Sequence, residues 1–178
     1  KGYCIMAIRC LILDVDGVLT KGEITYTSSG EEIKAFHAKD GLGLALAQRM
    51  GLQTAIITGR TSPIVERRAK ELKISHIQMG SHNKSAGLQE LLKTLELEAH
   101  EVAYMGDDLN DLGIMSKVGL AMTPQDGVPE VKQVAHYICQ ANGGQGAVRE
   151  AVEYILKQAG LWEDAVRSYR EESYQAGQ

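Results

Sequence analysis

The sequence predicts an α/β protein: a single Rossmann-like domain with a mostly parallel sheet, helices on both faces, a projecting β-hairpin and no separate cap domain. Short aliphatic runs typical of buried strands alternate along the chain with amphipathic segments typical of helices. The 178 residues suffice for one well-packed domain and are too few for two. No internal repeat or low-complexity tract interrupts the alternation. We therefore treat residues 1–178 as one domain.

The first predicted strand ends in two carboxylates. Arg9 is the only charged residue among residues 8–13. A nearly continuous apolar run of this kind is typical of a central strand covered on both faces. Asp14 and Asp16 follow, and Gly17 relaxes the backbone so that both acids can face one crevice at the carboxyl end of the sheet. Two carboxylates 4 Å apart repel by about 4 kcal/mol at an effective dielectric constant of about 20, so this site needs a cation, a proton or separation of the groups. Alone, Asp-x-Asp-Gly also fits a turn in which one Asp caps the next element.

Residues 22–37 predict a β-hairpin beside these acids. Ile24 and Tyr26 alternate with polar residues, and Ser28-Ser29-Gly30 supplies the turn. An isolated two-stranded ribbon is marginally stable in water. We therefore expect the hairpin to pack against another subunit, to act as a lid, or to pack on its own domain.

The remaining elements continue the alternation in order. The C-terminal tail, about residues 160–178, contains a weak apolar stripe followed by a polar end that we expect to be mobile. Predicted strands cover residues 54–57, 74–79, 102–105, 120–122 and 137–139, and predicted helices begin near Asp40, Pro63, Lys84, Leu109, Pro129 and the Asn142-Gly143-Gly144-Gln145-Gly146 turn.

Chemically reactive side chains follow four of the predicted strands. Because the carboxyl ends of parallel strands meet at one edge of a sheet, we expect these side chains to converge. Carboxylates without His or Cys at ligand spacing favour a hard cation such as Mg²⁺. A hydroxyl, a lysine and backbone amides suit a phosphoryl group, so the set predicts phosphoryl transfer through a carboxylate nucleophile. Its members are Asp14 and Asp16, then Thr58, then Lys84, then Asp107, Asp108 and Asp111.

These residues lie in four motifs that carry a family resemblance. DVDGVLT, IITGR, the lysine of GSHNK, and GDDLND resemble, in the same order and at strand ends, the motifs of the haloacid dehalogenase superfamily of phosphatases. The resemblance implies that Asp14 is the nucleophile and that Asp16 protonates the leaving group and then activates water. It also implies Mg²⁺ ligands (Asp14, the Asp16 carbonyl and Asp107), phosphate ligands (Thr58, Gly59 and Lys84), and two auxiliary acids that add a ligand or orient the lysine (Asp108 and Asp111).

Further segments narrow the resemblance. The GEITYT hairpin, FHAKDG, QMGSHNK and GGQGAVRE make residues 7–158 similar to the phosphatases of 3-deoxy-D-manno-octulosonate 8-phosphate, a sugar-acid phosphate of lipopolysaccharide precursor synthesis. The phosphatases of nonulosonate 9-phosphates share most of these motifs and are the alternative. Family members of this capless type are homotetramers in which neighbouring hairpins cover each active site, which is the expected assembly here. Asp40, Arg60 and Arg149 are candidate contacts to the rest of the substrate.

Composition argues against other classes of protein. The net charge of −4, without a basic cluster, argues against nucleic-acid binding, and no run of about 18 apolar residues suggests a membrane span. The cytoplasm is the expected location. Cys4, Cys10 and Cys139 form no C-x-x-C pair and are expected to be buried free thiols, and the five histidines share no metal-ligand spacing.

Two other phosphate-handling folds are the competing interpretations. A receiver-type signalling domain also phosphorylates an Asp at a strand end, but its acid pair normally precedes the phosphorylated strand, and here the second acidic cluster comes much later. It remains the non-enzymatic alternative. A phosphate-binding loop is excluded because GSHNKS is one residue short and has no glycine before its lysine.

Overall fold

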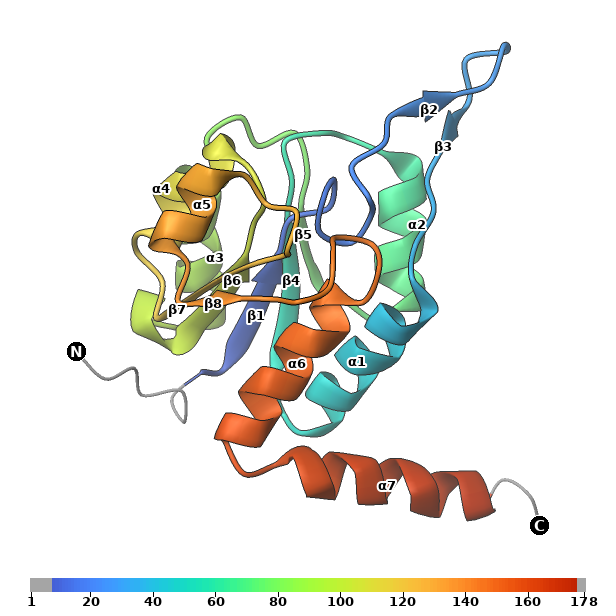
Figure 1. Cartoon of the computed structure of the whole chain (residues 1–178), viewed down its shortest axis with the longest axis vertical. Helices are drawn as coiled ribbons and strands as arrows, with labels where there is room; N and C mark the ends of the chain where they lie inside the picture. Colours follow the sequence, from blue (N-terminus) through green and yellow to red (C-terminus); the bar gives the residue numbers. More distant parts are fainter. Residues whose placement is uncertain (1–7, 176–178) are drawn as a thin grey trace.

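The computed structural model describes residues 8–175 and confirms the predicted architecture. Within that range, a six-stranded sheet in the order β5-β4-β1-β6-β7-β8 forms the centre, and a two-stranded ribbon, β2-β3, lies apart from it (Figure 1). Each neighbouring pair in the large sheet is parallel, whereas the ribbon is antiparallel. The strands are β1 (Cys10–Leu13), β2 (Thr25–Tyr26), β3 (Glu32–Ile33), β4 (Gln53–Ile57), β5 (His76–Gln78), β6 (Val102–Met105), β7 (Leu120–Thr123) and β8 (Tyr137–Ile138).

Helices cover both faces of the sheet. In β1, Leu11 and Leu13 belong to one hydrophobic cluster, whereas Cys10 and Ile12 belong to the other. This two-sided burial explains why the strand has a nearly continuous apolar sequence. The first cluster is completed by α1 (Ala38–Arg49), α2 (Pro63–Glu71), α6 (Ala147–Gln158) and α7 (Trp162–Gln175), and the second by α3 (Lys84–Leu95), α4 (Leu112–Met115) and α5 (Pro129–Val134).

Helix starts follow the predicted capping residues. The Ser62 hydroxyl accepts a hydrogen bond from the Val65 amide, and Pro63 occupies the first turn of α2. The helix predicted from Leu109 is divided into a 3₁₀ turn, η3 (Leu109–Asp111), and the short α4, and a second 3₁₀ turn, η2 (Ala99–Glu101), precedes β6. These caps fix where each strand end gives way to the next helix.

The C-terminal segment, for which the sequence predicted only a weak apolar stripe, is helical. Residues 162–175 form α7 (Figure 1). Trp162 anchors this helix, because its ring lies 5.3 Å from the Arg149 guanidinium carbon and 5.5 Å from the Lys157 ammonium, and Ala165 is fully buried. The weak apolar stripe understated this helix because the aromatic anchor lies at its start. The predicted mobile end at residues 176–178 lies outside the described residues.

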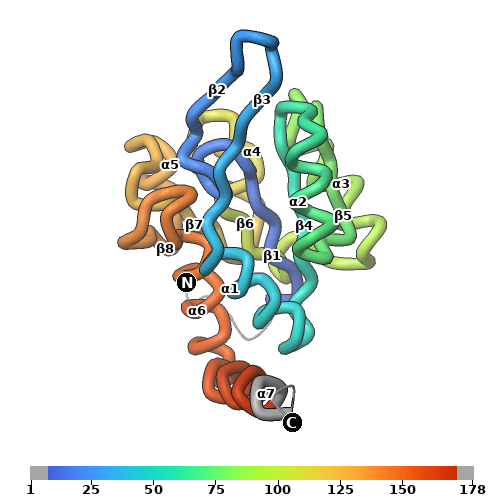
Figure 2. The backbone as a smooth tube through the Cα atoms, turned by 90° about the vertical axis from the view of Figure 1, so that its right-hand side faces the viewer, coloured from blue at the N-terminus to red at the C-terminus, as the bar shows by residue number. Residues whose placement is uncertain are grey.

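The hairpin is present and projects from the domain (Figure 2). Three of its large apolar side chains are exposed: Ile24 by 46%, Tyr26 by 56% and Ile33 by 51%. Exposed apolar residues on a projecting ribbon are typical of a contact surface.

Two of the three cysteines lie within the described residues. Cys10 and Cys139 are buried free thiols, as predicted, and Cys4 lies outside the described residues. Among residues 8–175, no helix combines the length and the apolar character that a bilayer crossing requires.

Candidate active site

The predicted site residues converge at the carboxyl edge of the sheet. β1 lies between β4 and β6, so the loops that follow these three strands meet there. A cavity of ≈ 230 Å³ opens between them. Its lining contains Asp14, Asp16, Gly22, Thr58, Gly59, Arg60, Asp107, Asp108 and Asn110. Of these, Gly22 and Asn110 were not predicted from the sequence.

Lys84 contacts Asp14, which lines the cavity, and pairs with two carboxylates. It is the first residue of α3, is 3% exposed, and donates to Asp14 Oδ2 and to Asp111 Oδ1, at 2.7 Å each. Burial lowers the pKa of Lys84, but the two carboxylates more than offset it, so the net pKa is raised. The ammonium is therefore charged at neutral pH and is held directly beside Asp14.

Asp111 is fully buried and accepts hydrogen bonds from four donors. Oδ1 accepts from Lys84 and from the Tyr104 hydroxyl, and Oδ2 accepts from the Asp107 and Asp108 amides at 2.9 and 3.1 Å. A carboxylate offers about four lone-pair positions. Asp111 therefore orients Lys84 and has no position left for a cation.

Asp108 differs from Asp111 because it lines the cavity. Its Oδ1 accepts from the Leu109 amide at 2.7 Å, and its side chain also accepts from the Asp111 amide in the capping box that fixes η3. Of the two auxiliary acids, Asp108 is therefore the one with carboxylate positions available to a ligand.

Burial and mutual repulsion raise the pKa values of Asp14 and Asp107. Burial, followed by repulsion from Asp111, raises the pKa of Asp14 to about 6, even though Lys84 opposes the shift. Burial, followed by repulsion from Asp14, raises the pKa of Asp107 to about 7. These shifts indicate that the site lacks positive charge and favours a bound cation.

The donor set fits Mg²⁺. Oxygen atoms of Asp14, Asp107 and Asp111 lie within 4.8 Å of one another, and this cluster contains no His or Cys. Because Asp111 is saturated, Asp14 and Asp107 are the acids with free positions, and hard oxygen ligands of this kind select Mg²⁺ or Ca²⁺ over softer metals. A Cβ at Gly17 would lie 2.0 Å from Asp107 Oδ2, so the glycine leaves the space that the carboxylate occupies.

The hairpin contributes a buried lysine that sequence analysis missed. Lys34 Nζ lies 2.5 Å from Asp16 Oδ1 and 3.3 Å from Glu32 Oε1, and its side chain is 1% exposed. The Ser62 hydroxyl donates to Glu32 Oε2 at 2.5 Å. The base of the hairpin is thus attached to Asp16 and to the start of α2.

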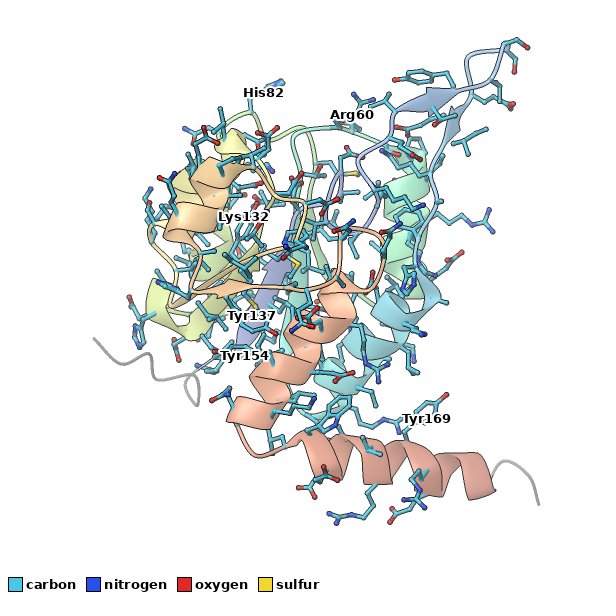
Figure 3. All side chains as sticks on the ribbon, in the orientation of Figure 1. Arg60, His82, Lys132, Tyr137, Tyr154 and Tyr169 are labelled. Atoms are coloured by element: carbon cyan, nitrogen blue, oxygen red, sulfur yellow. The ribbon has the colours of Figure 1, made fainter. Side chains whose placement is uncertain are left out.

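Arg60 completes this ion network. Its Nε lies 3.7 Å from Asp16 Oδ2, its Nη2 lies 3.7 Å from Glu32 Oε1, and Nη2 donates to the Tyr26 hydroxyl at 3.0 Å. Arg60 lies beside the hairpin base and lines the cavity (Figure 3). Of the three predicted substrate contacts, Arg60 is the one that the structure places at the cavity.

The other two predicted substrate contacts have structural roles. The buried Asp40 accepts a hydrogen bond from the Arg149 amide at 2.8 Å, which fixes the start of α6 against α1. The Arg149 guanidinium packs on Trp162, and its Nε donates to Glu153 at 2.8 Å. Neither residue lines this cavity, so their contact with substrate stays a prediction.

The glycine-rich turn before α6 holds the loop that carries the acids. The Gly144 amide donates to the Val18 carbonyl at 2.9 Å, and a Cβ at Gly143 would lie 1.8 Å from the Gly17 carbonyl oxygen. Only a residue without a side chain permits this approach at Gly143. The turn therefore supports the loop that carries Asp14 and Asp16, a contact that the sequence pattern did not indicate.

Comparison with known proteins places the chain in a family. A model of haloacid dehalogenase-like hydrolases matches residues 73–152. The 3-deoxy-D-manno-octulosonate 8-phosphate phosphatase KdsC of Yersinia pestis is 44% identical over 149 residues, covering 84% of this chain and 80% of that protein. The chain belongs to the 3-deoxy-D-manno-octulosonate 8-phosphate phosphatase family. The family member from Escherichia coli K12 is 43% identical over 158 residues, or 89% of this chain and 84% of that protein.

Solved structures of family members share the fold. The Moraxella catarrhalis phosphatase, in complex with magnesium ion, phosphate ion and a KDO molecule, superimposes with a TM-score of 0.90 at 42% identity. The match covers 93% of this chain and 95% of that chain. The cobalt-bound Haemophilus influenzae family member has a TM-score of 0.86 at 36% identity, covering 89% of this chain and 92% of that chain.

Proposed function

We propose that this chain is a Mg²⁺-dependent phosphomonoesterase that hydrolyses 3-deoxy-D-manno-octulosonate 8-phosphate to the free sugar acid and phosphate. The observation that carries the proposal is the pairing of the buried Asp14 with Lys84 at 2.7 Å, next to the cavity that Asp16 and Asp107 also line. Family membership at 43–44% identity supports the same reaction and the same substrate class.

In the first half of the reaction, Asp14 acts as the nucleophile. An oxygen of its carboxylate attacks phosphorus, the bond from phosphorus to the sugar oxygen breaks, and Asp16 gives that oxygen a proton. The products of this step are the sugar acid, an aspartyl phosphate on Asp14 and ionised Asp16. The second half restores the enzyme. Asp16 takes a proton from water as the water oxygen attacks phosphorus, and the bond to Asp14 breaks to release phosphate.

Residues in and next to the cavity would bind the phosphoryl group. Lys84 and Thr58 supply an ammonium and a hydroxyl, and backbone amides near Gly59 supply further donors. Asp14, the Asp16 carbonyl and Asp107 would hold Mg²⁺, with Asp108 as the candidate for an additional ligand. The cation supplies positive charge that offsets the negative charge on the phosphoryl oxygens.

Substrate selection is assigned to the hairpin side of the cavity. Arg60 is 45% exposed at the side chain and is the guanidinium that lines the cavity. A guanidinium can bind the carboxylate of the sugar acid through two hydrogen bonds. Hexose phosphates have no carboxylate on the sugar and cannot make this contact. Glu32 and Asp16 lie 3.7 Å from the Arg60 guanidinium, and the Tyr26 hydroxyl accepts from it at 3.0 Å, so these groups direct Arg60 along the hairpin side of the cavity.

Assembly as a homotetramer is part of the proposal. The exposed Ile24, Tyr26 and Ile33 make the projecting hairpin suited to contact a neighbouring subunit. Light scattering of the purified protein should give the mass of four chains, and replacing these three residues with Ser should yield smaller species. A monomer with full activity would rule out the tetramer while leaving the chemistry intact.

A phosphate-release panel tests the substrate. The octulosonate 8-phosphate should be cleaved with at least about 100-fold higher kcat/KM than glucose 6-phosphate, and only when Mg²⁺ is present. The nonulosonate 9-phosphates are the nearest competitors, and a higher kcat/KM for them would assign the alternative substrate. Comparable values for the octulosonate and a neutral hexose phosphate would refute the assignment. A long-lived aspartyl phosphate would instead indicate a receiver-type switch.

A further inference from the structure

The buried hydroxyl of Tyr104 lies next to the site, but no function has yet been assigned to it. Tyr104 is in the middle of β6, is 0% exposed, and donates to Asp111 Oδ1 at 2.5 Å. The ring fills core space as a Phe ring would, whereas a buried hydroxyl is costly unless it has a partner. Here the partner is the carboxylate that also holds Lys84.

The hydroxyl and the ammonium share one oxygen atom. Asp111 Oδ1 accepts from Tyr104 and Lys84, while Oδ2 accepts from two backbone amides. Each additional donor reduces the negative charge that the carboxylate presents to the others. Lys84 is held at the same distance, 2.7 Å, from Asp111 and from Asp14. Without the hydroxyl, Asp111 would attract the ammonium more strongly, away from Asp14.

We propose that Tyr104 is a positioning residue that keeps Lys84 directed at the nucleophile and at the phosphoryl group. It does so by occupying the Asp111 oxygen that Lys84 also uses, so that Asp111 holds the ammonium without withdrawing it from Asp14. This inference rests on the proposed function in one respect, the binding of phosphate by Lys84. It does not depend on which sugar is the leaving group.

Tyr104→Phe tests the inference, and Tyr137→Phe is the matched control. Tyr137 also donates its hydroxyl to a carboxylate, Glu150 Oε1 at 2.8 Å, and its ring stacks on Tyr154 with centroids 4.0 Å apart (Figure 3). Glu150 keeps hydrogen bonds from the Gln140 and Ala141 amides when the hydroxyl is removed. Both variants thus lose one hydroxyl-to-carboxylate bond, but only Tyr104 reaches Lys84 through its carboxylate.

The measurements are steady-state hydrolysis of p-nitrophenyl phosphate with Mg²⁺, inhibition by inorganic phosphate, and thermal unfolding. We expect Tyr104→Phe to lower kcat about 10- to 100-fold and to raise the phosphate inhibition constant, because residues that orient a site ligand typically contribute this much. Tyr137→Phe should change both by less than about 3-fold. If Tyr104→Phe leaves both within about 3-fold of wild type, or if the two variants lose activity equally, the inference is wrong.

A double-mutant cycle with Asp111→Asn supplies a second test, with kcat scaled to the folded fraction. Because Tyr104 is inferred to act through the Asp111 carboxylate, Tyr104→Phe should have little further effect in the Asp111→Asn background. Full additivity of the two losses would overturn the inference. An enzyme that cleaves p-nitrophenyl phosphate but not the octulosonate would contradict the proposed substrate and leave this test intact.

Discussion

Replacing Gly143 with Ala tests whether the glycine-rich turn holds the catalytic loop. The new Cβ would lie 1.8 Å from the Gly17 carbonyl oxygen and 2.5 Å from its carbonyl carbon, whereas ordinary contact begins at 3.4 Å. Backbone must therefore move by about 1.6 Å at one side of this contact, and a misplacement of about 1 Å at a reacting group can reduce the rate on the order of 100-fold. We expect a loss of kcat of that size.

Gly119→Ala is the control for this prediction. Its Cβ would lie 2.0 Å from the His100 carbonyl oxygen, a similar backbone clash, but Gly119 precedes β7 at the opposite edge of the sheet. Overpacking of this kind costs about 1–3 kcal/mol, which for a chain of this size lowers Tm by roughly 2–12 °C. Both variants should lose stability, and only Gly143→Ala should lose kcat. Hydrolysis of p-nitrophenyl phosphate, scaled to the folded fraction from circular dichroism, checks this. Equal kcat values for the two folded variants would refute the reasoning.

Three further predictions concern the acids. Asp14→Asn should abolish turnover at unchanged fold, because the amide matches the carboxylate in size but cannot attack phosphorus; substantial activity of the folded variant would exclude Asp14 as nucleophile. Asp16→Asn should slow hydrolysis of alkyl phosphates more than that of p-nitrophenyl phosphate, because the p-nitrophenolate leaving group scarcely needs a proton. Lys34→Met should slow the two substrates in the same order, because Lys34 fixes Asp16 at 2.5 Å. Equal losses with both substrates would count against these roles of Asp16 and Lys34. Folding raises the pKa of Asp14 to about 6 and that of Asp107 to about 7, so the metal-free protein should lose stability as the pH rises through these values. Mg²⁺ binds the ionised carboxylates in place of the protons, so adding Mg²⁺ should increase Tm more at about pH 8 than at about pH 5. A larger increase at about pH 5 would contradict this prediction.

Pattern and topology predicted the alternation, the parallel sheet and the strand ends that form the cavity. This succeeds because buried strands have a distinct apolar signature and because parallel strands must place their carboxyl ends together. Thr58, Gly59 and Asp107 accordingly line one cavity. Helix N-caps could also be predicted from the local sequence, as Ser62 at the start of α2 shows.

The remaining parts of the site depend on pairs that are distant in sequence. Lys34 contacts an acid 18 residues away, and Asp40 fixes an amide 109 residues away. Local hydrophobic periodicity does not indicate such pairs, so the contact of Lys34 with Asp16 and that of Asp40 with the Arg149 amide were not predicted. Tyr104 was missed for another reason: in a strand of apolar neighbours it resembles an ordinary core aromatic.

The contact between the glycine-rich turn and the catalytic loop has a consequence for how activity arises during synthesis. The Gly144 amide and the Val18 carbonyl are 126 residues apart in sequence, yet they are hydrogen-bonded. A nascent chain that has emerged only as far as residue 140 already carries every acid, the lysine and the threonine proposed for catalysis, but not the backbone that holds the loop in place. Contacts across such separations form late, because a long segment of chain must first be ordered. Phosphatase activity therefore marks completion of the whole fold, and a ribosome-bound fragment with all four motifs should be inert.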